Sequence, residues 1–424
     1  MRINNKYLSN YSWLTSEFLI RNIILFVTTI LILNEIDPVV YGRISIINNL
    51  ALFLFPLLYF GSRAIYLLRF SLAKDQIEIL NEFNKGFSLR IFISLAYTSI
   101  LLFIKIFFDI PLYALIILLT LSIEVLDINS DLCVAKSLNK INTVKTTFAN
   151  FFYLIILLIF LALNSIDIIT LSLLYLIRST VSFCVGFYLT IKKLNIKFNF
   201  TLDYNYFIEI FKKSKFLIIS IMAGAGFAFF SQLIVKNYFD EFYLGIFSVS
   251  YLILILLTSI FSNYSTAIIS HTFKNHSNFN NLSISISAPL YLSILLCLLV
   301  WITSDHMFNI FLPADYFESS VIVKYFTLYI VLFSFRPIFE KILLAKGLNN
   351  LIAIRNLLFL ILSSVISILL IYLNLGLESI PLSYFISELL ILIFIVNHNK
   401  SKFLKPIILN SFFKIPSIYE KLIR

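Results

Sequence analysis

Charged residues are scarce in this chain: 13% of its 424 residues are Asp, Glu, Lys or Arg, whereas 60% are hydrophobic. Soluble domains carry about 25% charged residues. The shortage therefore excludes an ordinary soluble protein, and the mean hydropathy of +0.95 indicates that lipid surrounds most of the chain.

Reactive and metal-binding side chains are scarce too. The three cysteines, Cys133, Cys184 and Cys297, are widely spaced and form no CxxC pair, which excludes a disulfide framework. The four histidines show no metal-ligand spacing. The sequence contains no P-loop, HExxH motif or nucleophile elbow. We therefore expect a protein without a catalytic site, a bound metal or an organic cofactor.

Long apolar runs dominate the rest of the sequence. A helix that spans the membrane needs about 20 apolar residues, and runs of that length predict twelve spanning helices. Their expected bounds are 16–35, 44–68, 88–108, 111–134, 146–165, 168–191, 216–236, 242–270, 284–303, 319–341, 351–373 and 379–397.

Basic residues are distributed unevenly between alternate loops. With a cytoplasmic N-terminus, the loops on that side contain most of the Lys and Arg residues, and the opposite loops contain only Arg43, Lys105 and Lys236. The positive-inside rule then places both termini in the cytoplasm. This distribution accounts for the net charge of +11 without a nucleic acid partner.

Short motifs recur in the two halves of the chain. Residues 37–45 and 240–248 share the pattern D-x4-G-x2-S at a shift of 203, and residues 135–139 and 345–349 match at a shift of 210. These matches predict an internal duplication.

The predicted duplication gives two lobes of six helices, 1–197 and 198–424, the second ending in a basic cytoplasmic tail. Because each lobe has an even number of helices, both have the same orientation and are related by a pseudo-two-fold axis along the membrane normal. We expect the substrate site in the cleft between the lobes and a mechanism of alternating access.

Three stretches carry a resemblance to a known family. They are the first-loop pattern from Asp37 to Ser45 with the following 60–65 (FGSRAI), the stretch 343–349 (LLAKGLN), and 374–388 at the start of the last helix. Together they resemble the polysaccharide flippases known as Wzx, members of the MOP (multidrug, oligosaccharidyl-lipid, polysaccharide) exporters. The chain departs from the family by having only nine glycines and by Pro381.

The resemblance implies an all-α MOP/MATE-like fold in a bacterial inner membrane. It implies a substrate, undecaprenyl-pyrophosphate carrying an oligosaccharide such as an O-antigen repeat unit, that is moved from the cytoplasmic to the periplasmic leaflet. A polysaccharide polymerase and a chain-length regulator would be further partners.

Four arginines lie within the expected helices and are candidates for substrate binding: Arg178 near mid-membrane, and Arg21, Arg63 and Arg336 in the cytoplasmic halves. A planar guanidinium suits a pyrophosphate, and ionisable residues at this depth usually face a cavity. Structural ion pairs are the alternative for all four, and snorkelling to the interface is a further one for the last three. Arg355 lies nearer a helix end, where we expect it to snorkel.

Acidic residues within the helices are candidates for coupling to an H⁺ or Na⁺ gradient. Glu124, Asp127 and Asp131 are spaced i, i+3 and i+7, so we expect them to face one way. Three like charges on a dry face would not all stay ionised, which suits a proton relay or a cation site. Salt bridges to Arg178 or another arginine of the same lobe are the alternative.

Two further acids complete this set. Glu388 is the corresponding lone acid of the second lobe, and Glu17 precedes Arg21 by four residues, as in a helical ion pair.

Two other functions remain open from the sequence. A multidrug exporter of the same superfamily would share the fold but would be expected to have an acidic or apolar cleft. A polytopic O-antigen polymerase usually needs a large outer loop, whereas the longest outer loop here is near residues 304–319.

Overall fold

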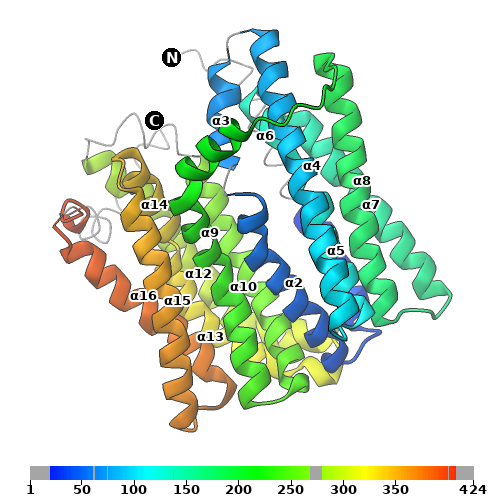
Figure 1. The fold of residues 1–424 in the computed structure, drawn as a ribbon. Coiled ribbons are helices and arrows are strands. Elements are labelled where there is room, and N and C mark those ends of the chain that lie inside the picture. The colour runs from blue at the N-terminus through cyan, green and yellow to red at the C-terminus, as the bar shows by residue number, and fades with distance from the viewer. Residues whose placement is uncertain are drawn as a thin grey trace, which may run out of the picture. The chain divides into compact units, whose positions relative to one another are not determined.

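The computed structural model describes residues 20–60, 63–73, 75–136, 138–267, 279–399 and 401–406 (Figure 1). These residues form helices and their connections, with no strand among them. Eleven helical segments are long and apolar enough to cross a membrane, and a shorter apolar helix, Ile20–Leu33, precedes them. The expected all-α polytopic fold is confirmed.

The labelled helices have the following bounds: α2 (Pro38–Leu58), α3 (Arg63–Leu72), α4 (Gln76–Phe107), α5 (Leu112–Val125), α6 (Ile128–Ala135), α7 (Asn139–Ala162), α8 (Ile168–Leu194), α9 (Tyr204–Tyr238), α10 (Glu241–Ala267), α12 (Phe279–Phe311), α13 (Glu318–Phe333), α14 (Arg336–Ala345), α15 (Asn349–Tyr372) and α16 (Ser379–Asn397). Two short 3-10 turns, η1 (Ala314–Tyr316) and η2 (Gly376–Glu378), precede α13 and α16.

Several helices begin earlier than the apolar runs predict. α4 begins at Gln76 rather than at 88, α7 at Asn139 rather than at 146, and α9 at Tyr204 rather than at 216. A count of apolar residues misses these starts because the first turns are rich in polar side chains. Basic residues expected at loop edges, among them Lys145, therefore lie on helices.

Aspartates fix many of the helix starts. The side chains of Asp37, Asp75, Asp167, Asp203 and Asp240 each accept a hydrogen bond from the backbone N–H three residues on, over 2.6–3.1 Å. Each bond satisfies a donor that the first helical turn leaves without a partner. At Asp167, hydrogen bonds from Thr170 lower the pKa of the carboxyl group.

The second expected helix, 44–68, is divided into two. α2 ends at Leu58, Phe60 has a φ of +52° in the left-handed region, and α3 begins at Arg63. The prediction of one continuous helix was wrong because a left-handed residue ends the helical hydrogen-bond pattern whatever its hydrophobicity.

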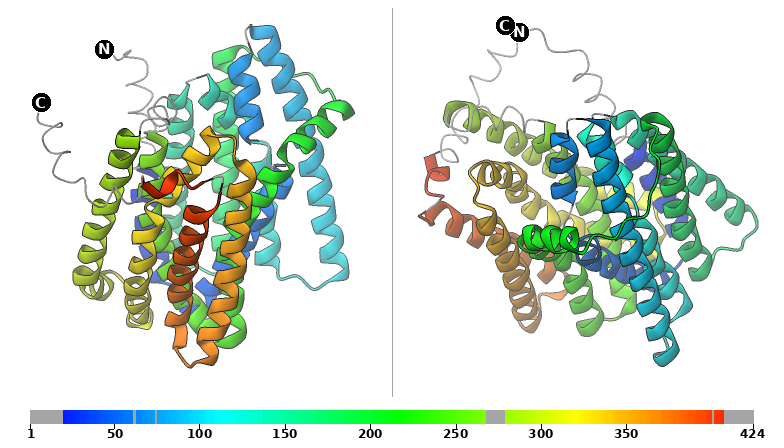
Figure 2. Two further views of the ribbon diagram at one scale, coloured as in Figure 1. Left: turned by 90° about the vertical axis from the view of Figure 1, so that its left-hand side faces the viewer. Right: turned by 45° about the horizontal axis from the view of Figure 1, so that its top comes forward.

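The described residues divide into two compact units by their contacts. Unit 1 contains the residues up to Ile36 together with Ile44–Ile218, and unit 2 contains Asp37–Arg43 and the residues from Ile219 onward. The helix α9, continuous in Figures 1 and 2, therefore begins in unit 1 and ends in unit 2. The expected lobes 1–197 and 198–424 remain a prediction.

The two units repeat the same helix pairs. In unit 1, α5 packs against α4 and α8, and α7 packs against α6 and α8; in unit 2, α13 packs against α12 and α16, and α15 packs against α14 and α16. One helix in each unit is interrupted at the corresponding point. Two residues separate α5 from α6, and two separate α13 from α14. A duplicated lobe predicts this repetition.

Two glycines allow a close approach within unit 2. A Cβ atom added to Gly245 would lie 2.0 Å from the carbonyl oxygen of Pro38, and one added to Gly42 would lie 2.8 Å from the backbone nitrogen of Gly245. The first turn of α2 thus rests directly on the backbone of α10. A salt bridge of 2.5 Å between Arg43 and Glu241 flanks this contact.

We predict that Gly245→Ala destabilises the protein by about 1–3 kcal/mol, because the new methyl group overlaps backbone rather than a flexible side chain. The thermal midpoint of the detergent-solubilised protein would measure the loss. Gly224→Ala is the matched control, since its Cβ atom meets nothing within 4 Å. Equal midpoints for the two variants would contradict the close approach.

Candidate functional site

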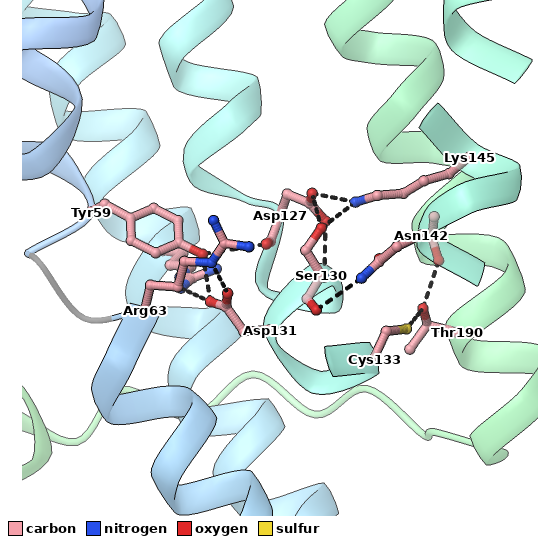
Figure 3. Close-up of polar contacts among 11 residues, drawn as sticks. Tyr59, Arg63, Asp127, Ser130, Asp131, Cys133, Asn142, Lys145 and Thr190 are labelled. Atoms are coloured by element: carbon pink, nitrogen blue, oxygen red, sulfur yellow. Dashed lines mark hydrogen bonds and ion pairs between the residues drawn. The ribbon is translucent and has the colours of Figure 1, made fainter. Parts of the chain in front are cut away.

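The interruption between α5 and α6 builds a polar centre in unit 1 (Figure 3). Asp127 caps α6: its Oδ1 accepts from the Ser130 backbone over 3.3 Å, and its Oδ2 accepts from the Ser130 hydroxyl over 2.7 Å. Lys145 of α7 donates to both Asp127 and Ser130. Its side chain is 5% exposed, so this ammonium group reaches its partners inside the unit.

Gly186 of α8 makes room for the Lys145 side chain. A Cβ atom at this position would lie 2.6 Å from Cδ of Lys145. The cation therefore reaches Asp127 through a space that any larger residue at 186 would narrow.

Asp131 of α6 forms a second centre and is fully buried. Its Oδ2 accepts from the Tyr59 hydroxyl over 2.5 Å and from Nη2 of Arg90 over 2.9 Å, and its Oδ1 lies 3.2 Å from Nε of Arg63. Figure 3 shows Tyr59 and Arg63 reaching Asp131 from the side opposite to Lys145. Two guanidinium groups on one carboxylate leave a net positive charge.

The two arginines of this centre differ in exposure. Arg90 is 2% exposed and lies over the rings of Tyr59 and Tyr66, at 3.9 and 4.7 Å from their centroids. Arg63 is 63% exposed, so its guanidinium group is accessible at the surface of unit 1 while Asp131 holds one edge of it.

Arg90 is a site residue that the sequence analysis missed. The distribution of basic residues between loops assigns it to a cytoplasmic loop. A signal was present, because Phe83, Phe87 and Arg90 recur at helical spacing and the two phenylalanines belong to the apolar core of unit 1.

Glu124 lies apart from the other two acids of its segment. It is exposed, accepts a hydrogen bond from the Ser179 hydroxyl over 3.0 Å, and neighbours Arg178, which is half-buried above the Tyr153 ring at 5.9 Å. The expectation that Glu124, Asp127 and Asp131 share one face of a helix was wrong, because the interruption after Val125 ends that helix.

In unit 2 the interrupted helix also carries buried charge. Nε of Arg336 donates to Oε1 of Glu340 over 3.1 Å, and its Nη2 donates to the Asn356 side chain over 2.8 Å. The Arg336 side chain is 8% exposed. It is therefore held inside unit 2 and does not snorkel.

Arg355 of α15 connects two acids. Its Nη1 donates to Oε1 of Glu340 over 2.9 Å, and its Nη2 donates to Oε1 of Glu388 on α16. The side chains of Arg355 and Glu388 are each 3% exposed. The expected snorkelling of Arg355 was wrong, because two carboxylates from other helices hold its guanidinium group in the interior.

A cavity of about 330 Å³ opens beside this network in unit 2. Arg336, Glu340 and Lys341 of α14 line it, together with the rings of Phe227, Tyr251, Tyr329 and Phe333. Hydroxyl groups of Thr258 and Ser262 on α10 add hydrogen-bonding partners. The cavity therefore combines cationic groups, aromatic faces and hydroxyls.

The structure describes one of the two candidate residues near the first helix. Arg21 lies on the helix Ile20–Leu33 and is half-buried. Glu17 lies outside the described residues, so the expected Glu17–Arg21 pair stays a prediction. Within the described residues, no group of three or more His, Cys, Asp or Glu side chains could hold a metal ion.

Neither a family model nor a curated protein matches the chain. Among solved structures, it is similar to the lipid II flippase MurJ in an inward closed conformation, with 16% identity and a TM-score of 0.73 over 96% of this chain and 92% of that chain. An outward-facing multidrug resistance MATE transporter of the MOP superfamily has 13% identity and a TM-score of 0.68, over 99% of this chain and 98% of that chain.

A third similar structure is a MOP superfamily transporter from Pyrococcus furiosus, with 12% identity and a TM-score of 0.66 over 97% of this chain and 96% of that chain. At these identities the likeness shows the fold. The protein is a multi-pass membrane protein with the fold of the MOP-superfamily transporters and flippases.

We predict that Arg90→Gln destabilises the protein by about 3–5 kcal/mol, because it breaks a buried ion pair and leaves the buried Asp131 with the largely exposed Arg63 as its remaining cation. Thermal unfolding in detergent would measure this. The double variant with Asp131→Asn should lose less stability than the sum of the two single variants. Lys193→Gln, exposed at the end of α8, is a control with an effect within about 0.5 kcal/mol. Strict additivity of the two single variants would contradict the pairing.

Proposed function

We propose that the protein is a flippase for a lipid-linked oligosaccharide, undecaprenyl-pyrophosphate carrying a surface-polysaccharide repeat unit. The cavity of unit 2 carries this proposal, because it offers both chemistries that such a head group needs. The fold of the MOP superfamily supports it, and so does the resemblance of the sequence motifs to Wzx flippases.

The cationic wall of the cavity suits a pyrophosphate. Arg336 contributes a guanidinium group that can donate two parallel hydrogen bonds, and Lys341 contributes a second positive charge beside it.

The remaining walls suit a sugar. Tyr251, Tyr329 and Phe333 present aromatic faces with apolar area, and Thr258 and Ser262 present hydroxyls of the kind that fix a sugar's orientation. A site for a hydrophobic cation would need no guanidinium group in its wall, and this favours the lipid-linked oligosaccharide over a multidrug substrate.

Unit 1 contributes two further guanidinium groups in this proposal. Arg63 of the short helix α3, anchored by Asp131, is exposed, whereas Arg178 of the membrane-length helix α8, beside Glu124, is half-buried. Such side chains usually face a water-filled passage. Their role would be to attract the anionic head during its passage by alternating access.

The proposal also covers the setting of the protein. It places the chain in a bacterial inner membrane with both termini in the cytoplasm, moving its substrate from the cytoplasmic to the periplasmic leaflet. An H⁺ or Na⁺ gradient would drive transport through the acidic residues, and a polymerase and a chain-length regulator would act on the product.

We predict that Arg336→Lys lowers the rate of oligosaccharide flipping in proteoliposomes by about tenfold or more. The variant keeps the charge but loses the planar fork, and loss of 1.4 kcal/mol corresponds to a tenfold change. Leaflet distribution of a labelled undecaprenyl-pyrophosphate oligosaccharide would measure the rate. Lys193→Gln, exposed at the end of α8, is the control.

Two outcomes would contradict the proposal. One is a full rate in Arg336→Lys at equal protein levels. The other is vigorous export of a cationic dye by a protein that leaves the labelled oligosaccharide in place, which would select the multidrug exporter.

A further inference from the structure

Four charged side chains of unit 2 form a continuous series of ion pairs from the cavity wall into the interior. Arg336 contacts Glu340 at 3.1 Å, Glu340 contacts Arg355 at 2.9 Å, and Arg355 contacts Glu388. Arg336 and Glu340 line the cavity, whereas Arg355 and Glu388 lie behind it. Two positive and two negative charges balance, as a site with low dielectric constant requires.

Among these four linked side chains, Glu388 has a carboxylate oxygen that accepts no hydrogen bond. Its Oε1 accepts from Arg355, while its Oε2 is buried and has no hydrogen-bond partner within the described part of the chain. A buried carboxylate oxygen without a partner raises the free energy of the ionised state. Addition of a proton to this atom would remove the charge.

We propose that binding of an anion in the cavity is linked to uptake of a proton by Glu388. The anion, a phosphate or sulfate ester, accepts hydrogen bonds from Arg336 and weakens the contact between Arg336 and Glu340. Glu340 then draws Arg355 toward itself, and Glu388 loses part of its counter-charge. A proton from solvent adds to Oε2 of Glu388 and restores neutrality. This linkage deepens the proposed function because it uses the same cavity.

The groups around Glu388 are poorer acceptors of a proton than Glu388 itself. Arg355 of α15 donates to it, Tyr329 of α13 and Arg336 of α14 are near enough to interact with its charge, and Tyr384 lies on its own helix. Glu340 of α14 shares Arg355 with it. Neither tyrosine carries a negative charge near neutral pH, and these four helices contain no histidine. Glu340 is 29% exposed toward the cavity and keeps Arg355, so the proton goes to the more deeply buried carboxylate.

The duplicated helices of unit 1 lack this arrangement. At the shift of 210 residues, Lys145 corresponds to Arg355, but Ser130 corresponds to Glu340 and Arg178 corresponds to Glu388. Lys145 contacts Asp127 and Ser130 instead. The linked pair of acids is therefore a property of the second repeat.

The test uses the purified full-length protein and glucose 6-sulfate, an anionic sugar whose charge does not change near neutral pH. Calorimetric titrations in two buffers of different ionisation enthalpy give the number of protons taken up on binding. We expect uptake of up to about one proton per bound anion in the unsubstituted protein. Glu388→Gln should bind the probe with no proton uptake, and Ser387→Ala, a neighbouring buried hydroxyl on α16, should retain it.

A second measurement needs no variant. Linkage is reciprocal, so the affinity of the unsubstituted protein for glucose 6-sulfate should increase as the pH falls, by up to about tenfold per unit. A flat affinity between about pH 6 and pH 8 would overturn the proposal. Undiminished proton uptake by Glu388→Gln would also overturn it. A third such result is that the probe shows no saturable binding, or that its binding persists in Arg336→Gln.

The linkage and the proposed function can fail separately. Proton-linked binding of the probe by a protein that does not flip the labelled oligosaccharide would retain the linkage and reject that substrate. Flipping of the labelled oligosaccharide without proton-linked binding of the probe would retain the proposed function and reject the linkage.

Discussion

Buried charge must be balanced locally, and the polar interior of this protein follows from that requirement. The charged side chains at the centre of each unit are mostly buried, so each ionised group there needs an opposite charge within a few ångströms. Asp131 meets this need through Arg90 and Arg63, Asp127 through Lys145, and the arginines of α14 and α15 through Glu340 and Glu388. Apart from Arg336 and Glu340, which both lie on α14, the partners come from different helices, so these pairs also fix how the helices pack.

The interrupted helices make this balance possible. In an unbroken helix the interior backbone N–H groups are all bonded within the helix and cannot donate to side chains. An interruption within a membrane frees backbone N–H and C=O groups, and these need new hydrogen-bond partners. In unit 1, Asp127 is such a partner, because it accepts from the first turn of α6. In unit 2, Pro337 lies in the first turn of α14, where its missing N–H leaves nothing unsatisfied. Each unit thus reaches the same geometry with different residues.

Hydropathy alone predicted an all-α fold with many apolar helices of membrane-spanning length, because the apolar runs are a property of the local sequence. The positions of Arg90, Lys145 and Arg355 could not be predicted in this way. A basic residue near a helix end has the same local sequence whether it extends to the interface or turns inward. The choice depends on a carboxylate from another helix, which only the folded structure brings close.

The contact between Gly186 and Lys145 has an evolutionary consequence. The long side chain at 145 and the missing side chain at 186 share one volume, although the two residues lie on different helices. Selection on either position therefore acts on both. In related sequences a residue with a side chain at 186 should occur together with a shorter residue at 145, and a loss of the cation should release the constraint on its neighbour.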